Sequence, residues 1–259
     1  MAINLKSHRE IELMRKAGLV VANVLSKLKE LAKPGESTGY LNEVALEMTE
    51  RAFAKALFKG VTSPYAEMPF PGAICASVNE QVVHGIPSDT VRLKDGDILS
   101  IDFGISLNGY CADAAITVGI GQISASKIRL IDVTREALEI AVAESKPSIK
   151  WSYVASRIQQ YVEAAGFSVV TEFVGHGIGR EMHEEPKVPN FVSEELLADD
   201  IILQEGMVLA VEPMVNMGAE AVRILDDGWT VVTKDGKSSA HFEHTIAITK
   251  NGCEVLTVR

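Results

Sequence analysis

The stretch that decides the fold reads LKDGDILSIDFGI at residues 93–105, and LQEGMVLAVEPMV at residues 203–215 repeats its pattern. Each copy has a Gly turn followed by an apolar run rich in β-branched residues, which is typical of a buried strand. Each run also contains a carboxylate, Asp102 in the first and Glu212 in the second. An ionised carboxylate in a buried strand is unstable unless it is paired or binds a metal, because it loses its hydration there. The repeated anomaly predicts two half-sites that face each other across a pseudo-twofold axis and hold cations between them.

The repeat extends into the segments that precede these strands. We expect the final helix to end at a Gly C-cap, Ala165-Gly166, and the Pro- and Gly-rich segment 60–75 to be a loop. Two helices followed by strands in each half predict an α/β (α+β) fold with helices on one face of a sheet. In each half a proline stops the first helix, and the predicted helices are 8–32 and about 38–58, then 125–146 and 151–165.

Length and composition narrow the class of protein. The 259 residues, 47% hydrophobic and 23% charged, suit a globular chain that buries a substantial core. No linker separates the halves, about 8–121 and 125–250, so we expect a single domain over 1–259. The net charge of −10 argues against a nucleic-acid-binding surface and is compatible with a cationic ligand.

The cysteines and the N-terminal sequence indicate a compartment. The cysteines number 3 and are widely spaced, so we expect no disulfide framework and a reducing environment. Charged residues occupy the N-terminus where a signal peptide needs an apolar stretch, and no run approaches the ~20 apolar residues of a membrane span. We expect a cytoplasmic protein, or a matrix-like one if a transit sequence has been removed.

A hairpin is predicted to bring two carboxylates onto one face. Asn108-Gly109 is the strongest short signal for a hairpin turn. If these two residues form the loop, Asp113 lies opposite Gly104, and Asp102 is its diagonal neighbour on the same face. The alternative is a surface hairpin with two solvated carboxylates, but the run Ile-Leu-Ser-Ile-Asp-Phe is too apolar for an open face.

Three histidines stand beside glycines or carboxylates. The Gly-rich loop around His176 follows a strand-like segment, 167–174, and lacks the Lys and Ser/Thr of a phosphate-binding loop. His183 begins no zincin helix, since Lys187 stands where the second His is needed. Taken singly, each is more typical of a structural or surface residue. His84 ends a short strand at a Gly-Ile-Pro turn, where its side chain can reach a cleft.

Two further carboxylates interrupt or open strands. Pro213 stops normal strand pairing directly after Glu212, and Glu243 opens a β-branched run between His241 and His244, which we expect to be structural. Several carboxylates and at least one His at strand ends suit two divalent ions, which can clamp the attacking and leaving groups of a hydrolysis. Oxygen-rich ligation favours manganese, iron(II), cobalt or zinc.

Together these motifs resemble type I methionine aminopeptidase over nearly the whole chain. The resemblance implies the pita-bread fold, a curved antiparallel sheet with a pseudo-twofold repeat and helices on one face. It is carried by NExxxHGIP at 79–87, Asp102 with Asp113, GHGIGxxxHExP at 175–186, Glu212-Pro-Met and Glu243-His-Thr.

The resemblance also assigns roles to residues of this chain. A metal-bridging hydroxide would attack the carbonyl after the initiator methionine of nascent proteins with a small second residue. Glu212 would be the general base, and His84 and His183 would hydrogen-bond the scissile peptide. Asp113 and Glu243 would bridge two divalent ions. The metal ligands would be Asp102, Asp113, His176, Glu212 and Glu243, and the methionine pocket would be lined by Phe70, Cys75, Met182 and Trp229.

The same resemblance implies partners and leaves alternatives open. The partners would be peptide N-termini, with transient ribosome association and neither nucleic-acid nor membrane binding, and the protein would be a monomer. Phe70, Met182 and Val83 replace the Tyr, Phe and Cys that are frequent in the family, and Ala residues follow Asp113 where Thr is usual. One alternative is an X-Pro aminopeptidase or prolidase, although such enzymes usually have a large N-terminal domain. The other is a non-catalytic pita-bread binding protein, although such proteins usually lose metal ligands.

Overall fold

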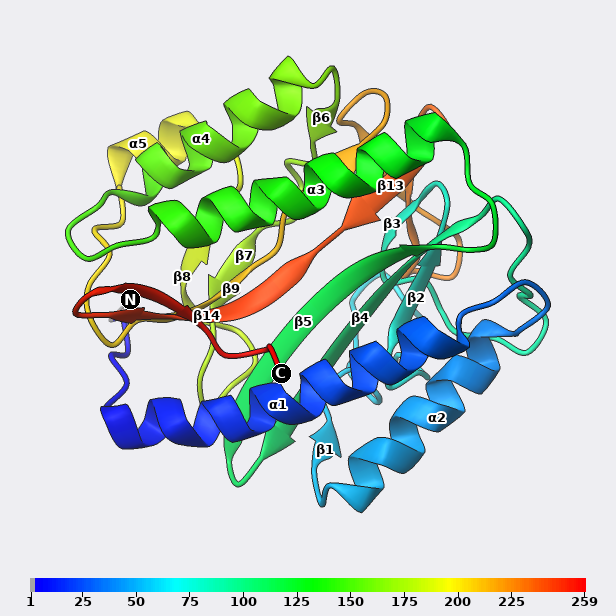
Figure 1. Ribbon diagram of the computed structural model, residues 1–259, viewed down its shortest axis with the longest axis horizontal. Helices are drawn as coiled ribbons and strands as arrows, with labels where there is room; N and C mark the ends of the chain where they lie inside the picture. Colours follow the sequence, from blue (N-terminus) through cyan, green and yellow to red (C-terminus); the bar gives the residue numbers. More distant parts are fainter. Residues whose placement is uncertain (1–2) are drawn as a thin grey trace.

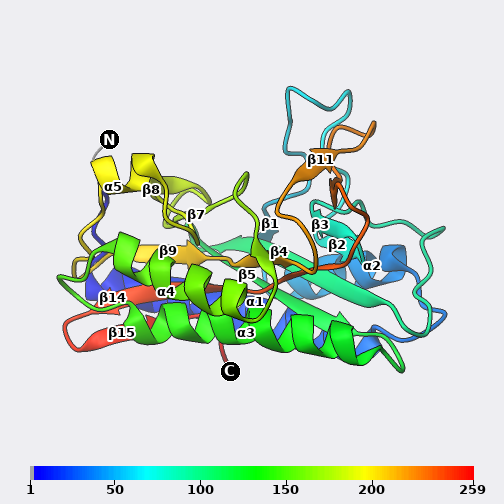
Figure 2. The same ribbon diagram turned by 90° about the horizontal axis from the view of Figure 1, so that it is seen from above.

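The computed structural model describes residues 3–259 and contains two pairs of long helices on one side of a curved sheet (Figures 1 and 2). Within these residues, no helix is both long and apolar enough to cross a membrane. The helices are α1 (His8–Leu31), α2 (Thr38–Arg51), α3 (Ala125–Glu144), α4 (Trp151–Ala164) and the short α5 (Glu194–Ala198).

The predicted helices of each half are present, with one wrong boundary. The helix predicted over 38–58 ends at Arg51, because Phe53 adopts a left-handed conformation with φ 54°. Residues Lys55–Ala56 then form β1, which pairs with β4 of the sheet. The expected C-cap of α4 is confirmed, since Ala165 caps the helix and Gly166 has φ 82°.

The strands form one large sheet and two small ones, and every strand pair is antiparallel. The nine-stranded sheet runs β1 (Lys55–Ala56), β4 (Ile98–Leu107), β5 (Tyr110–Gly119), β14 (Glu243–Thr249), β9 (Val208–Val211), β7 (Gly175–Gly177), β8 (Glu184–Val188), with β2 (Cys75–Val78) beside β4 and β15 (Gly252–Val255) beside β14. The small sheets are β13 (Ser239–His241), β10 (Met214–Asn216), β6 (Ser168–Val169), and β11 (Val222–Ile224), β12 (Val231–Thr233), β3 (Gln81–Val83).

The two halves repeat the same connection between helices and strands. In each, the turn after the first helix is tied to the start of the strand repeat by a pair of backbone hydrogen bonds. The glycine of each repeat then adopts a left-handed conformation, with φ 91° at Gly96 and φ 92° at Gly206. The matched bonds are Gly35 N–H to Leu93 O (2.8 Å) and Leu93 N–H to Glu36 O (2.9 Å), against Ser148 N–H to Leu203 O (2.8 Å) and Leu203 N–H to Ile149 O (2.9 Å).

Two predicted strand features are confirmed and one is wrong. The hairpin β4–β5 pairs Gly104 with Asp113, as the Asn108-Gly109 turn predicts. The second repeat breaks at Glu212-Pro213, between β9 and β10. The strand expected over 167–174 is reduced to Ser168–Val169, because only these residues pair with β10. The segment predicted to be a loop, 60–75, has no helix or strand up to Ile74, and its last residue, Cys75, begins β2.

The apolar core fills the space between the helices and the sheet in each half. Under α1 and α2 it contains the fully buried Leu28 and Phe103, and under α3 and α4 it contains the fully buried Trp151 and Leu209. Packing against the helices anchors this face of the sheet, while β8 and β11 lie on the side away from α3 (Figure 2).

Candidate metal centre

An inner pocket of about 130 Å³ lies on the face of the sheet opposite the helices. The structure brings together here every side chain that the sequence analysis named for the site. The pocket is lined by Phe58, Val61, Phe70, Cys75, His84, Asp102, Asp113, His176, Met182, His183, Glu212, Trp229 and Glu243.

Five neighbouring strands supply the charged part of the lining. Asp102 is in β4, Asp113 in β5, Glu243 at the start of β14, His176 in β7, and Glu212 directly after β9. These strands are adjacent in the sheet order β4-β5-β14-β9-β7. Residues far apart in the sequence therefore meet because antiparallel pairing places their strands side by side.

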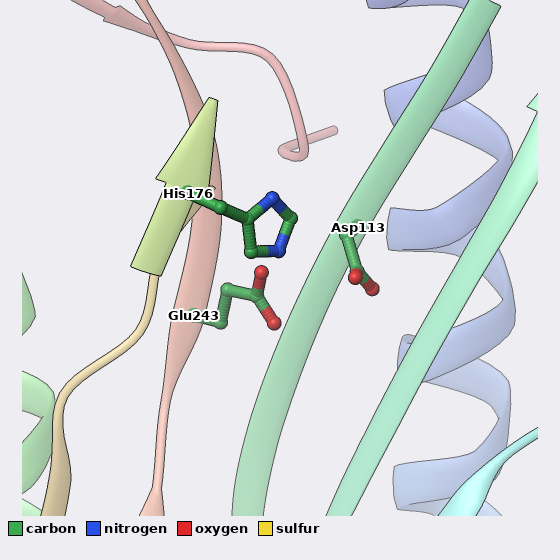
Figure 3. A group of neighbouring side chains, drawn as sticks. All are labelled: Asp113, His176 and Glu243. Atoms are coloured by element: carbon green, nitrogen blue, oxygen red, sulfur yellow. The ribbon is translucent and has the colours of Figure 1, made fainter. Parts of the chain in front are cut away.

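Three of these side chains form a compact group. Asp113, His176 and Glu243 each offer a ligand atom, and these atoms all lie within 4.8 Å of one another (Figure 3). All three side chains are buried, and they come from three different strands. Asp102 and Glu212 lie outside this compact group but line the same pocket.

Several oxygens of this cluster have no protein partner. Within residues 3–259, one carboxylate oxygen of each of Asp102, Asp113 and Glu243 is buried without a hydrogen bond. Buried polar atoms are nearly always satisfied, and an unsatisfied group often marks an ion site. Hard oxygen donors beside one imidazole are ligands that suit divalent manganese, iron, cobalt or zinc. The donor set therefore fits bound divalent cations.

The electrostatics of the carboxylates agree with that fit. Burial raises the pKa of Asp113 to about 7, although its contact with Asp102 works in the opposite direction. Burial first, and then neighbouring carboxylates, raise the pKa values of Asp102, Glu212 and Glu243 well above their usual range. Like charges this close disfavour the ionised forms unless a cation compensates them.

His176 is held as a neutral imidazole. Burial, and then the charge of His183, lower the pKa of His176 to about 4. Its Nδ1 lies 2.9 Å from the carbonyl oxygen of Gly177, which can only accept, so Nδ1 carries the hydrogen. The lone pair on Nε2 is then free for a cation. Nε2 also lies 3.7 Å from Oε1 of Glu212.

His84 and His183 line both the inner pocket and the wider groove beside it. The ring of His183 lies 4.3 Å from that of His176, measured between centroids, and burial lowers the pKa of His183. His84 has a left-handed backbone, φ 57°, and burial lowers its pKa to about 4. Both are neutral near pH 7, so each can donate one hydrogen bond and accept another.

The remaining lining is apolar and rich in sulfur. Phe70 and Trp229 meet edge to face, with ring centroids 5.2 Å apart, and Trp229 Nε1 donates to Met68 O at 2.9 Å. Burial, and then the charge of Asp102, raise the pKa of Cys75 well above its usual value, so its thiol stays protonated. Together with Met182, these side chains make a pocket that suits a flexible thioether.

Sequence reasoning missed two residues of the pocket lining. Phe58 and Val61 line the pocket, but apolar residues beside a predicted loop give no distinguishing signal. His241 is buried with Nε2 lying 3.8 Å from Oε2 of Glu212, and this Nε2 has no hydrogen bond within residues 3–259. The sequence analysis expected His241 to be structural, and His241 is not among the residues that line either cavity.

A wider groove of about 880 Å³ opens beside the inner pocket. Both cavities are lined by Val61, His84, His176, His183, Glu212 and Trp229, so they are continuous. The inner pocket is the smaller of the two, and an extended chain in the groove can place its terminal side chain there.

Comparisons with known proteins agree with this geometry. Residues 12–250 match metallopeptidase family M24. The methionine aminopeptidase of Clostridium perfringens is 49% identical over 256 residues, and the match spans 99% of this chain and 99% of the relative. That of Escherichia coli K12 is 42% identical over 260 residues, spanning 100% of this chain and 95% of the relative. These matches confirm the resemblance drawn from the motifs.

Solved structures show the same fold. The methionine aminopeptidase of Thermotoga maritima superposes with a TM-score of 0.93 at 42% identity, covering 100% of both chains. The prolidase of Pyrococcus horikoshii has a TM-score of 0.74 at 24% identity, covering 98% of this chain and 63% of the prolidase. At that identity the likeness to the prolidase concerns the fold alone.

Proposed function

The chain belongs to metallopeptidase family M24, and we propose that it is an aminopeptidase that removes N-terminal methionine from proteins whose second residue is small. The observation that carries this proposal is the position of an apolar, sulfur-containing pocket directly beside a cluster of buried carboxylates. A substrate whose first side chain fills this pocket presents its first peptide bond to the charged cluster.

We propose that Asp102, Asp113, His176, Glu212 and Glu243 hold two divalent ions, with Asp113 and Glu243 shared between them. The unpartnered oxygens of Asp102, Asp113 and Glu243 support this assignment. When bound, such ions lower the pKa of water and polarise the substrate carbonyl. Oxygen-rich ligation supports manganese, iron(II), cobalt or zinc as the metal.

The chain's own residues handle the proton and the substrate. The Glu212 carboxylate accepts the proton of the attacking water, since it lies where the inner pocket meets the groove. Neutral His84 and His183 hydrogen-bond the scissile peptide and stabilise the charge that develops on it. Phe70, Cys75, Met182 and Trp229 bind the methionine side chain. Some of these residues come from the first half of the chain and the others from the second, which supports residues 1–259 acting as one catalytic domain.

We propose that the substrates are emerging proteins in the cytoplasm, bound by a monomer that associates transiently with the ribosome. Three free thiols, on Cys75, Cys111 and Cys253, support a reducing compartment. The rival activities are less well supported. The prolidase likeness covers only the fold, and the intact set of candidate ligands argues against a non-catalytic binding protein.

The test is peptide hydrolysis by purified protein supplied with Mn²⁺ or Co²⁺. We expect release of methionine from Met-Ala-Ser and Met-Gly-Ser, slow reaction with Met-Leu-Ser, and none with Ala-Pro-Ser. Faster cleavage of the Ala-Pro peptide would favour an X-Pro aminopeptidase. Absence of hydrolysis with stoichiometric metal bound would favour a binding protein.

A further inference from the structure

The loop between β7 and β8, residues 178–183, carries two groups of the site. Met182 lines the apolar pocket, and the rings of His183 and His176 meet edge to face. A loop is more mobile than a strand, whereas a hydrogen-bond donor must be held within about 0.5 Å of its working position. Something in the structure must therefore restrain this loop.

The carboxylate of Glu184, the first residue of β8, provides one restraint on the loop. Its Oε1 accepts from Arg180 N–H at 2.8 Å and from Glu181 N–H at 3.3 Å, so it closes the turn. A Cβ atom on Gly179 would collide with this carboxylate and with the side chain of Lys6. The loop is packed tightly around Glu184.

Lys6, from the segment before α1, holds Glu184 in place. Its Nζ lies 2.5 Å from Glu184 Oε2 and donates to Asn4 O at 2.8 Å, and its side chain is only 3% exposed. Its backbone N–H donates to Gly206 O at 2.7 Å, which fastens the segment to the second repeat. A buried ion pair adds little net stability, since desolvation offsets its attraction, but it can specify one conformation.

We propose that Lys6 is a positioning residue for the reaction: through Glu184 it fixes the loop 178–183 so that His183 meets the scissile peptide. The inference rests on the proposed function. It assigns a part in turnover to Lys6, a residue that is not among those lining either cavity. The alternative is that the Lys6–Glu184 pair contributes to stability alone.

The first experiment separates these roles by the kinetics of K6M, which keeps the length of the side chain and removes its charge. We expect kcat on Met-Ala-Ser to fall about tenfold while KM changes less than about threefold, since misplaced donors weaken transition-state contacts most. The matched control is R15M, which breaks the Arg15–Glu254 pair (2.8 Å) between α1 and β15 and should leave kcat unchanged. A loss in K6M below about fivefold, or an equal loss in R15M, overturns the proposal.

The second experiment asks whether Lys6 acts through His183. In an H183A background, adding K6M should lower kcat less than about twofold further, because the donor that Lys6 positions is already gone. Fully additive losses in the double variant would show a separate, structural contribution and would overturn the proposal. Amide exchange over residues 178–184 should also be faster in K6M than in R15M, and equal protection contradicts the restraint.

Two controls keep the outcomes distinct. If K6M does not fold, E184Q replaces it, because the amide keeps an acceptor for Arg180 N–H while the ion pair is lost. A fold-change in kcat below about fivefold in E184Q would again overturn the proposal. If the parent protein itself fails to cleave Met-Ala-Ser, the proposed function fails, whatever K6M does to exchange in the loop.

Discussion

The first and second repeats begin with the same kind of Gly turn, but their carboxylates lie in different places relative to the strands. In the first, β4 runs unbroken over Ile98–Leu107, and Asp102 stays in the ladder opposite Ala115. In the second, β9 ends at Val211, because Pro213 has no N–H to continue the ladder. The chain leaves the sheet at Glu212 and resumes as β10.

This difference separates two chemical roles. Among residues 3–259, the lining of the outer groove includes Glu212 but not Asp102, while both line the inner pocket. A carboxylate fixed in a continuous strand suits a ligand with one geometry. A carboxylate at a break, between the side chains of His176 and His241, suits a group that must also receive a proton. The same framework thus suits Asp102 to a ligand role alone and Glu212 to the roles of ligand and base together.

The largest expected effect comes from E212Q. Because the amide keeps the volume but cannot accept a proton as a base, kcat should fall on the order of 10²–10⁴-fold with the fold preserved. D102N should instead raise the metal concentration needed for activity. Steady-state kinetics with increasing Mn²⁺ distinguish the two. If E212Q keeps more than about a tenth of the parent's kcat at saturating metal, Glu212 is not the general base.

A smaller difference is expected between the two turn glycines. Both G96A and G206A place a side chain in a left-handed conformation, which costs roughly 1–2 kcal/mol. The new Cβ in G206A would also lie 2.9 Å from the Lys6 carbonyl oxygen, whereas in G96A the nearest atom is 3.8 Å away. Urea denaturation should therefore show G206A to be the less stable variant. Equal stabilities would mean that the second turn is not tightly packed against the N-terminal segment.

The smallest effect concerns the first helix of each half. α1 begins with a capping box in which Glu10 accepts from Ser7 N–H, whereas α3 has only the Ser124 cap. Hydrogen bonds to Ser7, and then to Tyr110, lower the pKa of Glu10 to about 2. The stability that ionised Glu10 contributes is therefore complete above its ordinary pKa of 4.5 and is lost as pH falls toward 2.

E10Q and S124A test this difference. Each should lower the free energy of unfolding by up to about 1 kcal/mol at pH 7, since caps typically contribute that much. The deficit of E10Q should narrow as pH falls below 4.5, because Glu10 of the unfolded parent then takes up a proton that the folded form still resists, while that of S124A should not depend on pH. Thermal unfolding from pH 7 to pH 3 measures both. A deficit of E10Q that stays constant over this range contradicts the role of its charge.

Local signals predicted most of the fold and the charged site. The Asn108-Gly109 turn determines which face Asp113 occupies, and the prolines after the first helix of each half mark where it ends. These features depend on backbone chemistry within a few residues, so they can be read from sequence.

The features that the sequence did not predict correctly are those that depend on tertiary contacts. The end of α2 depends on Phe53 adopting φ 54° without a glycine, and on the pairing of Lys55–Ala56 with β4. No local pattern shows that Val61 reaches the pocket. The buried Lys6–Glu184 pair joins residues far apart in the chain, and a charged residue near an N-terminus normally indicates only a solvated surface.

Anomalous diffraction from crystals grown with Mn²⁺ tests most directly the claim that the two repeats jointly hold the metals. We expect two peaks about 3.5–4 Å apart, with ligands drawn from both halves among Asp102, Asp113, His176, Glu212 and Glu243. Peaks bound by residues of one half alone, or no peak near Asp113 at saturating Mn²⁺, would contradict the account.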